Sequence, residues 1–180
     1  QDWSLMRLGN SYLALALIMI SLLSVEVCAQ TSPPTALAEF EDLAITLVNL
    51  KSPQERESLL TKKKEFLTPD LRKALIRQGN AQLLAGRYSA AFDIYGLAKN
   101  ISEQIGDREG LATAWLDIGT VYYFQANYPA ALEHYKKARE LFTEVTNHYE
   151  SAKALSGLAL IYKEQRREKE ALEALQQVAD

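Results

Sequence analysis

Three segments of this 180-residue chain repeat one pattern at a fixed spacing. Residues 87–91 read RYSAA, residues 127–131 read NYPAA, and residues 168–171 read EKEA, a less close match. The alanines at 91, 131 and 171 are 40 residues apart. Equal spacing is typical of proteins in which each repeat is one supersecondary unit that stacks on the next. A plain helical bundle would not repeat the same residues at fixed intervals.

Residue spacing and capping signals predict helices throughout the chain after residue 35. Apolar residues recur at helical spacing at Leu37, Phe40, Leu43, Ala44, Leu47 and Val48. Ser52 precedes Pro53 and Thr68 precedes Pro69, and both pairs match an N-cap followed by proline in the first helical position. Because no stretch alternates with period two for long enough to form a sheet, we expect an all-α fold.

The clearest copy starts at Ala112 and resembles the tetratricopeptide repeat family. The residues at family positions are Trp115, Ile118, Gly119, Tyr122, Ala131, Tyr135 and Ala138. Gly119 and Ala131 are small where two helices would cross closely, and aromatic residues would fill the space around them. The resemblance implies tandem antiparallel helical hairpins stacked as a right-handed α-solenoid.

The other two copies follow the same register, so we place repeats at 72–111, 112–151 and 152–180, preceded by N-terminal helices over 36–68 that pack on the first repeat. The first copy has Gln78 and Gln82 where apolar residues are expected, so it is either partly open to solvent or covered by the upstream helices. The third copy has Arg166 at the turn instead of Gly, and we expect it to be truncated. Its second helix would leave Leu172, Leu175 and Val178 half covered, which predicts a continuing chain or a docked partner there.

The spacing of 40 residues exceeds the ~34 of the common repeat and resembles a 40-residue variant of the family. We expect the added residues to follow the second helix of each copy, over 100–110 and 142–150. Residues 65–79 also have a weaker resemblance to the lead-in of the first repeat in bacterial proteins where such repeats precede a caspase-like (CHAT) peptidase domain. That resemblance implies that the chain is the N-terminal part of something larger.

Residues 1–29 are typical of an export signal. Arg7 precedes an apolar run over 12–23, and Val27-Cys28-Ala29 follows it, so we expect cleavage after Ala29 and a linker over 30–35. The alternatives are a membrane anchor over 12–29, a buried helix of the fold, and an anchor made by a lipidated Cys28. The sequence thus predicts an exported protein, periplasmic or secreted, with no cysteine left after cleavage. Export fits a bacterial envelope, and a eukaryotic secretory route is the alternative.

In the family, partners often lie along the groove formed by the first helix of each hairpin. Carried over by position, the predicted groove residues are Asn80, Leu83, Leu116, Thr120, Tyr123, Phe124, Leu160 and Lys163. Tyr123 and Phe124 are the favoured anchors, because exposed aromatic residues often carry binding energy. For Phe124, packing against the neighbouring repeat is an equal alternative.

A clamp for a C-terminal carboxylate, known in the family, is not expected. The corresponding positions hold Ile76, Asn80, Asp117, Lys153 and Gly157. Only Asn80 and Lys153 match the clamp, and Asp117 would repel a carboxylate. An apolar or aromatic segment is the better match.

Composition and motifs favour a binding protein over an enzyme. The net charge of −3 gives no basic footprint for nucleic acid. His134, expected on an exposed helix surface, and His148, expected in a loop, have no metal-ligand spacing, and no cofactor motif is present. Two functions are therefore expected: an exported interaction scaffold or adaptor, or the regulatory or substrate-recruiting N-terminal arm of a larger bacterial enzyme such as a CHAT-type peptidase.

Overall fold

The computed structural model describes residues 36–179. The expected signal over 1–29 and the linker over 30–35 lie outside the described residues. The chain divides into two units, residues 1–36 and 37–180, and apart from Ala36 every described residue belongs to the second unit. Within the described range, no helix is both long and apolar enough to cross a membrane.

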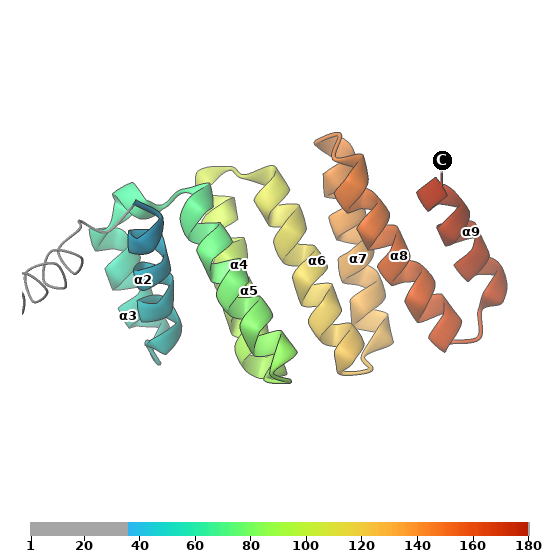
Figure 1. The fold of residues 1–180 in the computed structure, drawn as a ribbon, viewed down its shortest axis with the longest axis horizontal. Coiled ribbons are helices and arrows are strands. Elements are labelled where there is room, and N and C mark those ends of the chain that lie inside the picture. Colours follow the sequence, from blue (N-terminus) through green and yellow to red (C-terminus); the bar gives the residue numbers. More distant parts are fainter. Residues whose placement is uncertain (1–35, 180) are drawn as a thin grey trace, which may run out of the picture. The chain divides into compact units, whose positions relative to one another are not determined.

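All regular elements in the described range are helical, which confirms the all-α prediction (Figure 1). They are α2 (Ala36–Asn49), α3 (Pro53–Lys62), the 3-10 turn η1 (Lys64–Phe66), α4 (Pro69–Leu84), α5 (Tyr88–Ile105), α6 (Arg108–Phe124), α7 (Tyr128–Glu144), α8 (His148–Glu164) and α9 (Glu168–Ala179). His148, expected in a loop, is the first residue of α8.

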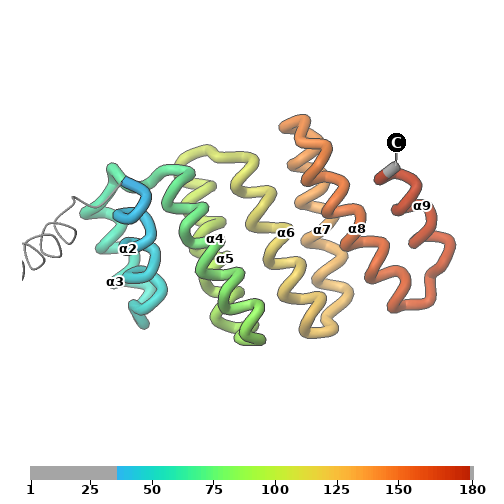
Figure 2. Tube along the Cα trace, in the orientation of Figure 1, coloured from blue at the N-terminus to red at the C-terminus, as the bar shows by residue number. Residues whose placement is uncertain are grey.

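Three consecutive hairpins pair α4 with α5, α6 with α7, and α8 with α9. The trace in Figure 2 runs through them in turn, and α5 packs on α6 and α7 on α8 to join each hairpin to the next. The second helices begin at Tyr88, Tyr128 and Glu168, at the spacing of 40 residues seen in the sequence.

The residues beyond a common repeat length lie mostly inside helices. The expectation that they would follow the second helix is wrong for 100–110, because α5 continues to Ile105 and α6 begins at Arg108. The same holds for 142–150, where α7 continues to Glu144 and α8 begins at His148. The longer repeat is therefore made with longer helices, and the turns between hairpins stay short.

One turn geometry recurs at the helix ends. Gly86 and Gly106 have φ of 70°, and Ala126, Thr146 and Arg166 have φ of 56–57°, all in the left-handed region. After α5, the N–H of Asp107 donates to the carbonyl of Ser102 at 2.9 Å, six residues inclusive. This bond closes the Schellman turn, which satisfies helix carbonyls that lack an intrahelical partner.

Side-chain caps begin four of the described helices, α3, α6, α7 and α8. Asp107, at the start of α6, accepts from the N–H of Gly110 at 2.8 Å, and Asn147, at the start of α8, accepts from Glu150 at 3.1 Å. Ser52 caps α3 in the same way, as expected. Thr68 precedes Pro69 as predicted, but it makes no side-chain cap bond, and its Oγ1 is buried without a hydrogen-bond partner among the described residues.

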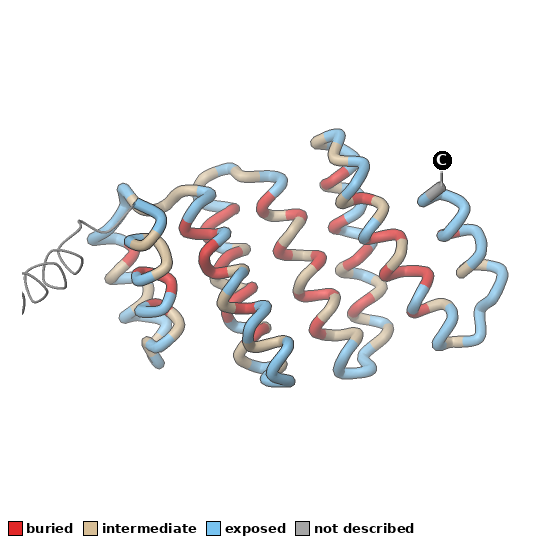
Figure 3. The backbone as a smooth tube through the Cα atoms, viewed as in Figure 1, coloured by how far each residue is buried: buried red, intermediate tan, exposed pale blue. Residues whose placement is uncertain are grey.

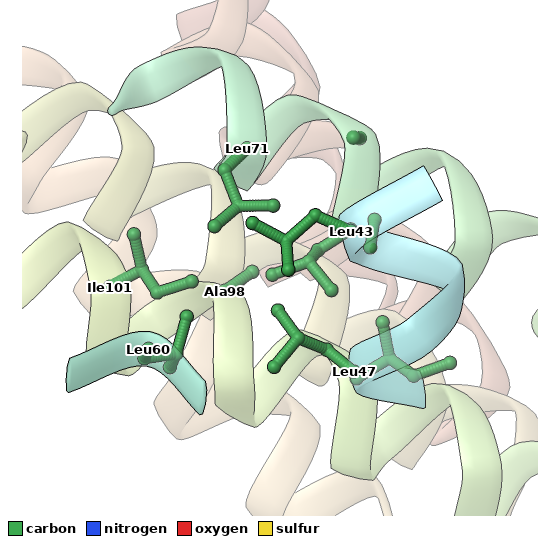
Figure 4. Close-up of a cluster of buried hydrophobic side chains, with 10 residues drawn as sticks. Leu43, Leu47, Leu60, Leu71, Ala98 and Ile101 are labelled. Atoms are coloured by element: carbon green, nitrogen blue, oxygen red, sulfur yellow. The ribbon is translucent and has the colours of Figure 1, made fainter. Parts of the chain in front are cut away.

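The helices before the first repeat share buried side chains with it. Leu43 and Leu47 of α2 and Leu60 of α3 share one buried cluster with α4 and α5 (Figure 4). The α4 and α5 side chains in that cluster are Leu71, Ala74, Leu75, Ile94, Ala98 and Ile101. Gln78 and Gln82 of α4 are half-buried, so the first repeat is only partly open to solvent.

Close helix crossings explain the repeated small residues. Figure 3 shows buried residues gathered where neighbouring helices face each other. A Cβ on Gly79 would lie 2.4 Å from Cε1 of Tyr95, and one on Gly119 would lie 2.9 Å from Cδ1 of Tyr135. Tyr135 also lies against Gly157 of α8, where a Cβ would come within 2.7 Å of its ring. One tyrosine thus fills the space beside both α6 and α8.

Candidate functional site

The first helices of the three hairpins lie next to one another, because α4 contacts α6 and α6 contacts α8. We call the side of these helices that carries the predicted groove residues the first-helix face. Its members are Asn80, Leu83, Asp117, Thr120, Tyr123, Phe124, Leu160 and Lys163.

Most of the predicted groove residues are accessible. Phe124 is 53% exposed and Leu160 49%. Asn80 and Lys163 are also exposed, and Leu83, Thr120 and Tyr123 are half-buried. Leu116 does not suit the role predicted for it, because it is only 8% exposed and packs in the core with side chains of α7 and α8.

Two polar members of the face are held by tyrosines from second helices. The hydroxyl of Tyr95 donates to Oδ1 of Asn80 at 2.6 Å. The hydroxyl of Tyr135 donates to Oγ1 of Thr120 at 3.2 Å. Burial is the largest cause that raises the pKa of both tyrosines, so each hydroxyl keeps its proton and remains a donor. These bonds fix the positions of the two side chains before any partner arrives.

Four aromatic rings gather where α4–α5 and α6–α7 turn. Phe124 stacks on Tyr88 of the preceding hairpin with centroids 5.9 Å apart and planes 7° apart. Tyr123 contacts both Phe124, at 5.7 Å, and Tyr128, at 6.1 Å. We call these four residues the turn aromatic cluster. Phe124 therefore packs against the neighbouring repeat, which is one of the two alternatives expected from the sequence. About half of its surface remains exposed to solvent.

Asp117 lies between α4 and α8 on the first-helix face, with a half-buried side chain. Its Oδ2 is buried and has no hydrogen-bond partner in the described part of the chain. Desolvation is the main cause that raises its pKa to about 7; Glu150 acts in the same direction, and Lys153 and Arg72 oppose the rise. Sequence reasoning identified only the repulsion that this residue would exert on a carboxylate.

A pocket of about 1070 Å³, lined by none of the residues of the first-helix face, lies between α3, η1 and α5. Trp115, Ile118 and His134 line its inner end. His134 is half-buried and packs against Trp115 and Tyr122, so its prediction as an exposed surface residue was wrong. Sequence reasoning missed this pocket, because it depends on how α3 packs beside α5.

The charges around this pocket favour neither sign. Arg56, Lys64 and Lys99 line it together with Glu57, Asp93 and Glu103. Lys99 and Glu103 pair with each other, with Nζ and Oε1 2.7 Å apart. Because three basic and three acidic side chains line the pocket, its charge does not indicate which class of ligand it would bind. Nor does the described chain contain a cluster of three or more His, Cys, Asp or Glu that could hold a metal ion.

The outer side of α9 is apolar and exposed, as the sequence predicts. Leu172 is 58% exposed, Leu175 51% and Val178 36%. Only Ala174 among the described side chains of α9 is buried.

Comparisons with known proteins agree with the fold. The crystal structure of BtubC (BKLC) from P. vanneervenii superposes with a TM-score of 0.56 at 21% sequence identity, over 69% of this chain. The chain spans about half, 54%, of that protein's chain, and the likeness shows the fold alone. Among curated proteins, none matches this chain by sequence. The family model described as tetratricopeptide repeat matches residues 70–144 and 110–180, more than half of the chain. The chain belongs to the tetratricopeptide repeat family.

Proposed function

We propose that this chain is an interaction scaffold or adaptor that binds an apolar or aromatic segment of a partner protein on the first-helix face. Tetratricopeptide repeats generally mediate binding to protein partners, and the family is typically non-catalytic. The observation that carries the proposal is the turn aromatic cluster, in which Phe124 is held by Tyr88 and remains 53% exposed.

The cluster has the properties of a binding anchor. Stacking on Tyr88 and contact with Tyr123 restrict the Phe124 ring, so little conformational entropy is lost when a partner covers it. Leu83 and Leu160 add apolar surface on the hairpins to either side. Asn80 and Thr120 add polar groups that are already oriented by Tyr95 and Tyr135. Rigid aromatic anchors beside oriented polar groups are typical of protein recognition sites.

Export is a part of the proposal that rests on residues 1–29. Their basic residue, apolar run and V-C-A end support a periplasmic or secreted protein, with an uncleaved anchor over 12–29 as the alternative. Mass spectrometry of the protein from intact cells distinguishes the two. A mature N-terminus at Gln30 supports export with cleavage, and retention of residues 12–29 in the membrane fraction supports the anchor.

A second role is supported by the resemblance of residues 65–79 to the lead-in found before CHAT-type peptidases. In that role, the same face would recruit a substrate or regulator for a larger bacterial enzyme. The segment that the face binds would then be part of that enzyme's substrate or regulator.

The binding test starts from random peptides of about twelve residues displayed on phage and selected on the whole chain. We expect enrichment of apolar and aromatic positions. Replacing Phe124 with Ala should weaken binding of the selected peptides by about tenfold, or about 1.4 kcal/mol. Leu37→Ala removes an exposed apolar side chain from α2, outside the first-helix face, and is the matched control, which should leave binding unchanged.

Circular dichroism shows whether both variants keep their helical content. The proposal fails when no peptide is selected. It also fails when Phe124→Ala, correctly folded, binds the selected peptides as well as the unchanged protein does.

A further inference from the structure

We propose that Asp117 forms a subsite for a cationic side chain, a lysine or arginine of the segment that the first-helix face binds. The proposal rests on the proposed function and adds the chemistry of one partner residue. Nothing in the family match assigns a role to this carboxylate.

Asp117 is the acidic member of a register position that holds a different residue in each repeat. Counting by 40 residues, the equivalent positions hold Arg77 in α4, Asp117 in α6 and Gly157 in α8. Gly157 is required to be small, because a Cβ there would meet the ring of Tyr135. Arg77 is held by an ion pair with Glu41 of α2. Asp117 has neither a packing reason nor an ion-pair partner in the described chain.

The cations near Asp117 are already engaged. Arg72 of α4 pairs with Asp107, with Nε and Oδ2 2.9 Å apart and both side chains largely buried. Lys153 of α8 pairs with Glu150, with Nζ and Oε2 also 2.9 Å apart. Each of the two cations that act on Asp117 therefore has another carboxylate as its ion-pair partner, and the ionised Asp117 has none among the described residues. The group that complements this site is a cation.

The site also has an acceptor that no donor of the described chain uses. Oδ2 of Asp117 is buried and accepts no hydrogen bond from the described residues. A buried acceptor without a donor costs free energy, and a charged donor recovers the most, because charge-assisted bonds are the strongest. An ammonium or guanidinium group supplies both the donor and the charge. A carboxylate would add repulsion and supply no donor.

The groups that face Asp117 make its charge state sensitive to such a ligand. Desolvation, with a contribution from Glu150, raises its pKa to about 7 against the opposing effect of Lys153 and Arg72. The charge of Asp117 in turn adds to the raised pKa values of Tyr95 on α5 and Tyr135 on α7. A bound cation favours the ionised carboxyl, so binding should lower this pKa and release a proton near neutral pH.

The first experiment repeats the peptide selection with Asp117→Asn. Asparagine keeps the shape and removes the charge. Peptides selected by the unchanged protein should carry lysine or arginine at one position, next to apolar or aromatic ones. Peptides selected by Asp117→Asn should keep the apolar positions and lose the basic one. Asp93→Asn removes an exposed charge on α5 and is the matched control, so its selection should match that of the unchanged protein.

The second experiment measures the dissociation constant of one selected peptide between pH 6 and pH 8. With a pKa of about 7, Asp117 is about one tenth ionised at pH 6 and about nine tenths at pH 8. If only the ionised form binds the cation, the dissociation constant should fall about tenfold over this interval. The lysine of the peptide stays charged throughout, since its pKa is about 10.4. Asp117→Asn should show no such change.

The outcomes separate the two proposals. A selection that yields no peptide overturns the proposed function, and this inference with it. A selection that yields apolar or aromatic peptides without a basic position leaves the proposed function standing and overturns the Asp117 subsite. The subsite is also overturned when Asp117→Asn keeps the basic preference or the same pH dependence.

Discussion

The contact between Gly79 and Tyr95 shows how a neighbouring side chain can require glycine at one position. Tyr95 is fully buried between α4 and α5, and its ring occupies the space that a side chain at position 79 would need. Its hydroxyl also reaches Asn80, the next residue along α4. One contact therefore sets both the distance between two helices and the position of a polar group on the first-helix face.

Replacing Gly79 with Ala should destabilise the protein. The new Cβ would lie 2.4 Å from Cε1 and 2.7 Å from Cδ1 of a ring that is fully buried. Overpacking of this kind typically costs about 1–3 kcal/mol. Urea unfolding followed by circular dichroism measures the change in the free energy of unfolding.

Gly96, in the middle of α5, is the matched control. A Cβ there would meet nothing within 4 Å, so alanine should stabilise the helix by about 0.5–1 kcal/mol. Equal effects of the two substitutions would contradict the role given to Tyr95.

The sequence predicted single residues well where the repeat pattern itself requires a small side chain. It predicted them less well where residues distant in sequence decide whether a side chain is exposed or paired. Gly119 was identified as a close-contact position, and the structure agrees. Leu116 was expected on the surface and is in the core, since the family register does not show how far α7 and α8 cover it. Asp117 is unpaired because Arg72 and Lys153 form ion pairs with Asp107 and Glu150 instead. These pairs involve residues distant in sequence from Asp117 or on other helices, so the sequence does not reveal them.

At the scale of elements, the left-handed turns differ in how well their residues suit them. Gly106 and Thr146 hold equivalent positions after α5 and α7, at φ of 70° and 56°. Glycine adopts this conformation without strain, whereas a β-branched residue does so at a cost. The same backbone geometry is therefore kept by residues of quite different preference.

Exchanging these two residue types should move stability in opposite directions. We expect Thr146→Gly to raise the free energy of unfolding by about 1 kcal/mol, because it removes the strain of the left-handed conformation. Gly106→Thr should lower it by a similar or larger amount. Thermal unfolding of the two variants and of the unchanged protein gives both signs in one experiment. A gain in stability from Gly106→Thr would show that the turn is not under this strain.

Most of the elements could be predicted from the sequence, because caps and apolar spacing are local signals. The starts of α3 and α4 at Pro53 and Pro69 are examples. The length of the second helices was not predicted. Residues 100–105 carry no signal that separates the last turns of α5 from a following loop, and the helix continues until Gly106 adopts the left-handed conformation.

Within residues 37–179, each hairpin packs mainly on its neighbours in sequence. Stability in such a stack is close to a sum of terms for single repeats and for the interfaces between them. The α2–α3 helices add a buried cluster at one end, whereas α9 contributes a single buried side chain among its described residues. The two ends of the unit are therefore held with different strength.

Hydrogen exchange should show this difference directly. In the 180-residue chain, amides of α9 should exchange first, because α9 packs mainly on α8 and its apolar side is exposed. Amides of α4 to α7, which are packed on both sides, should exchange last. Mass spectrometry of peptides after timed exchange measures the order. Equal protection of α9 and α5 would mean that the unit opens as one cooperative block.

The packing of each hairpin on its sequence neighbours also has a mechanical meaning. A pulling force applied along the chain acts on one interface at a time, since helices joined by side-chain packing separate by peeling rather than by shearing many hydrogen bonds together. Each released hairpin of about 40 residues would add more than about 100 Å of extended chain. Under tension, the distance between this protein's anchor point and a tethered partner would then increase in steps as hairpins unfold. It would decrease again when the hairpins refold after the tension ends.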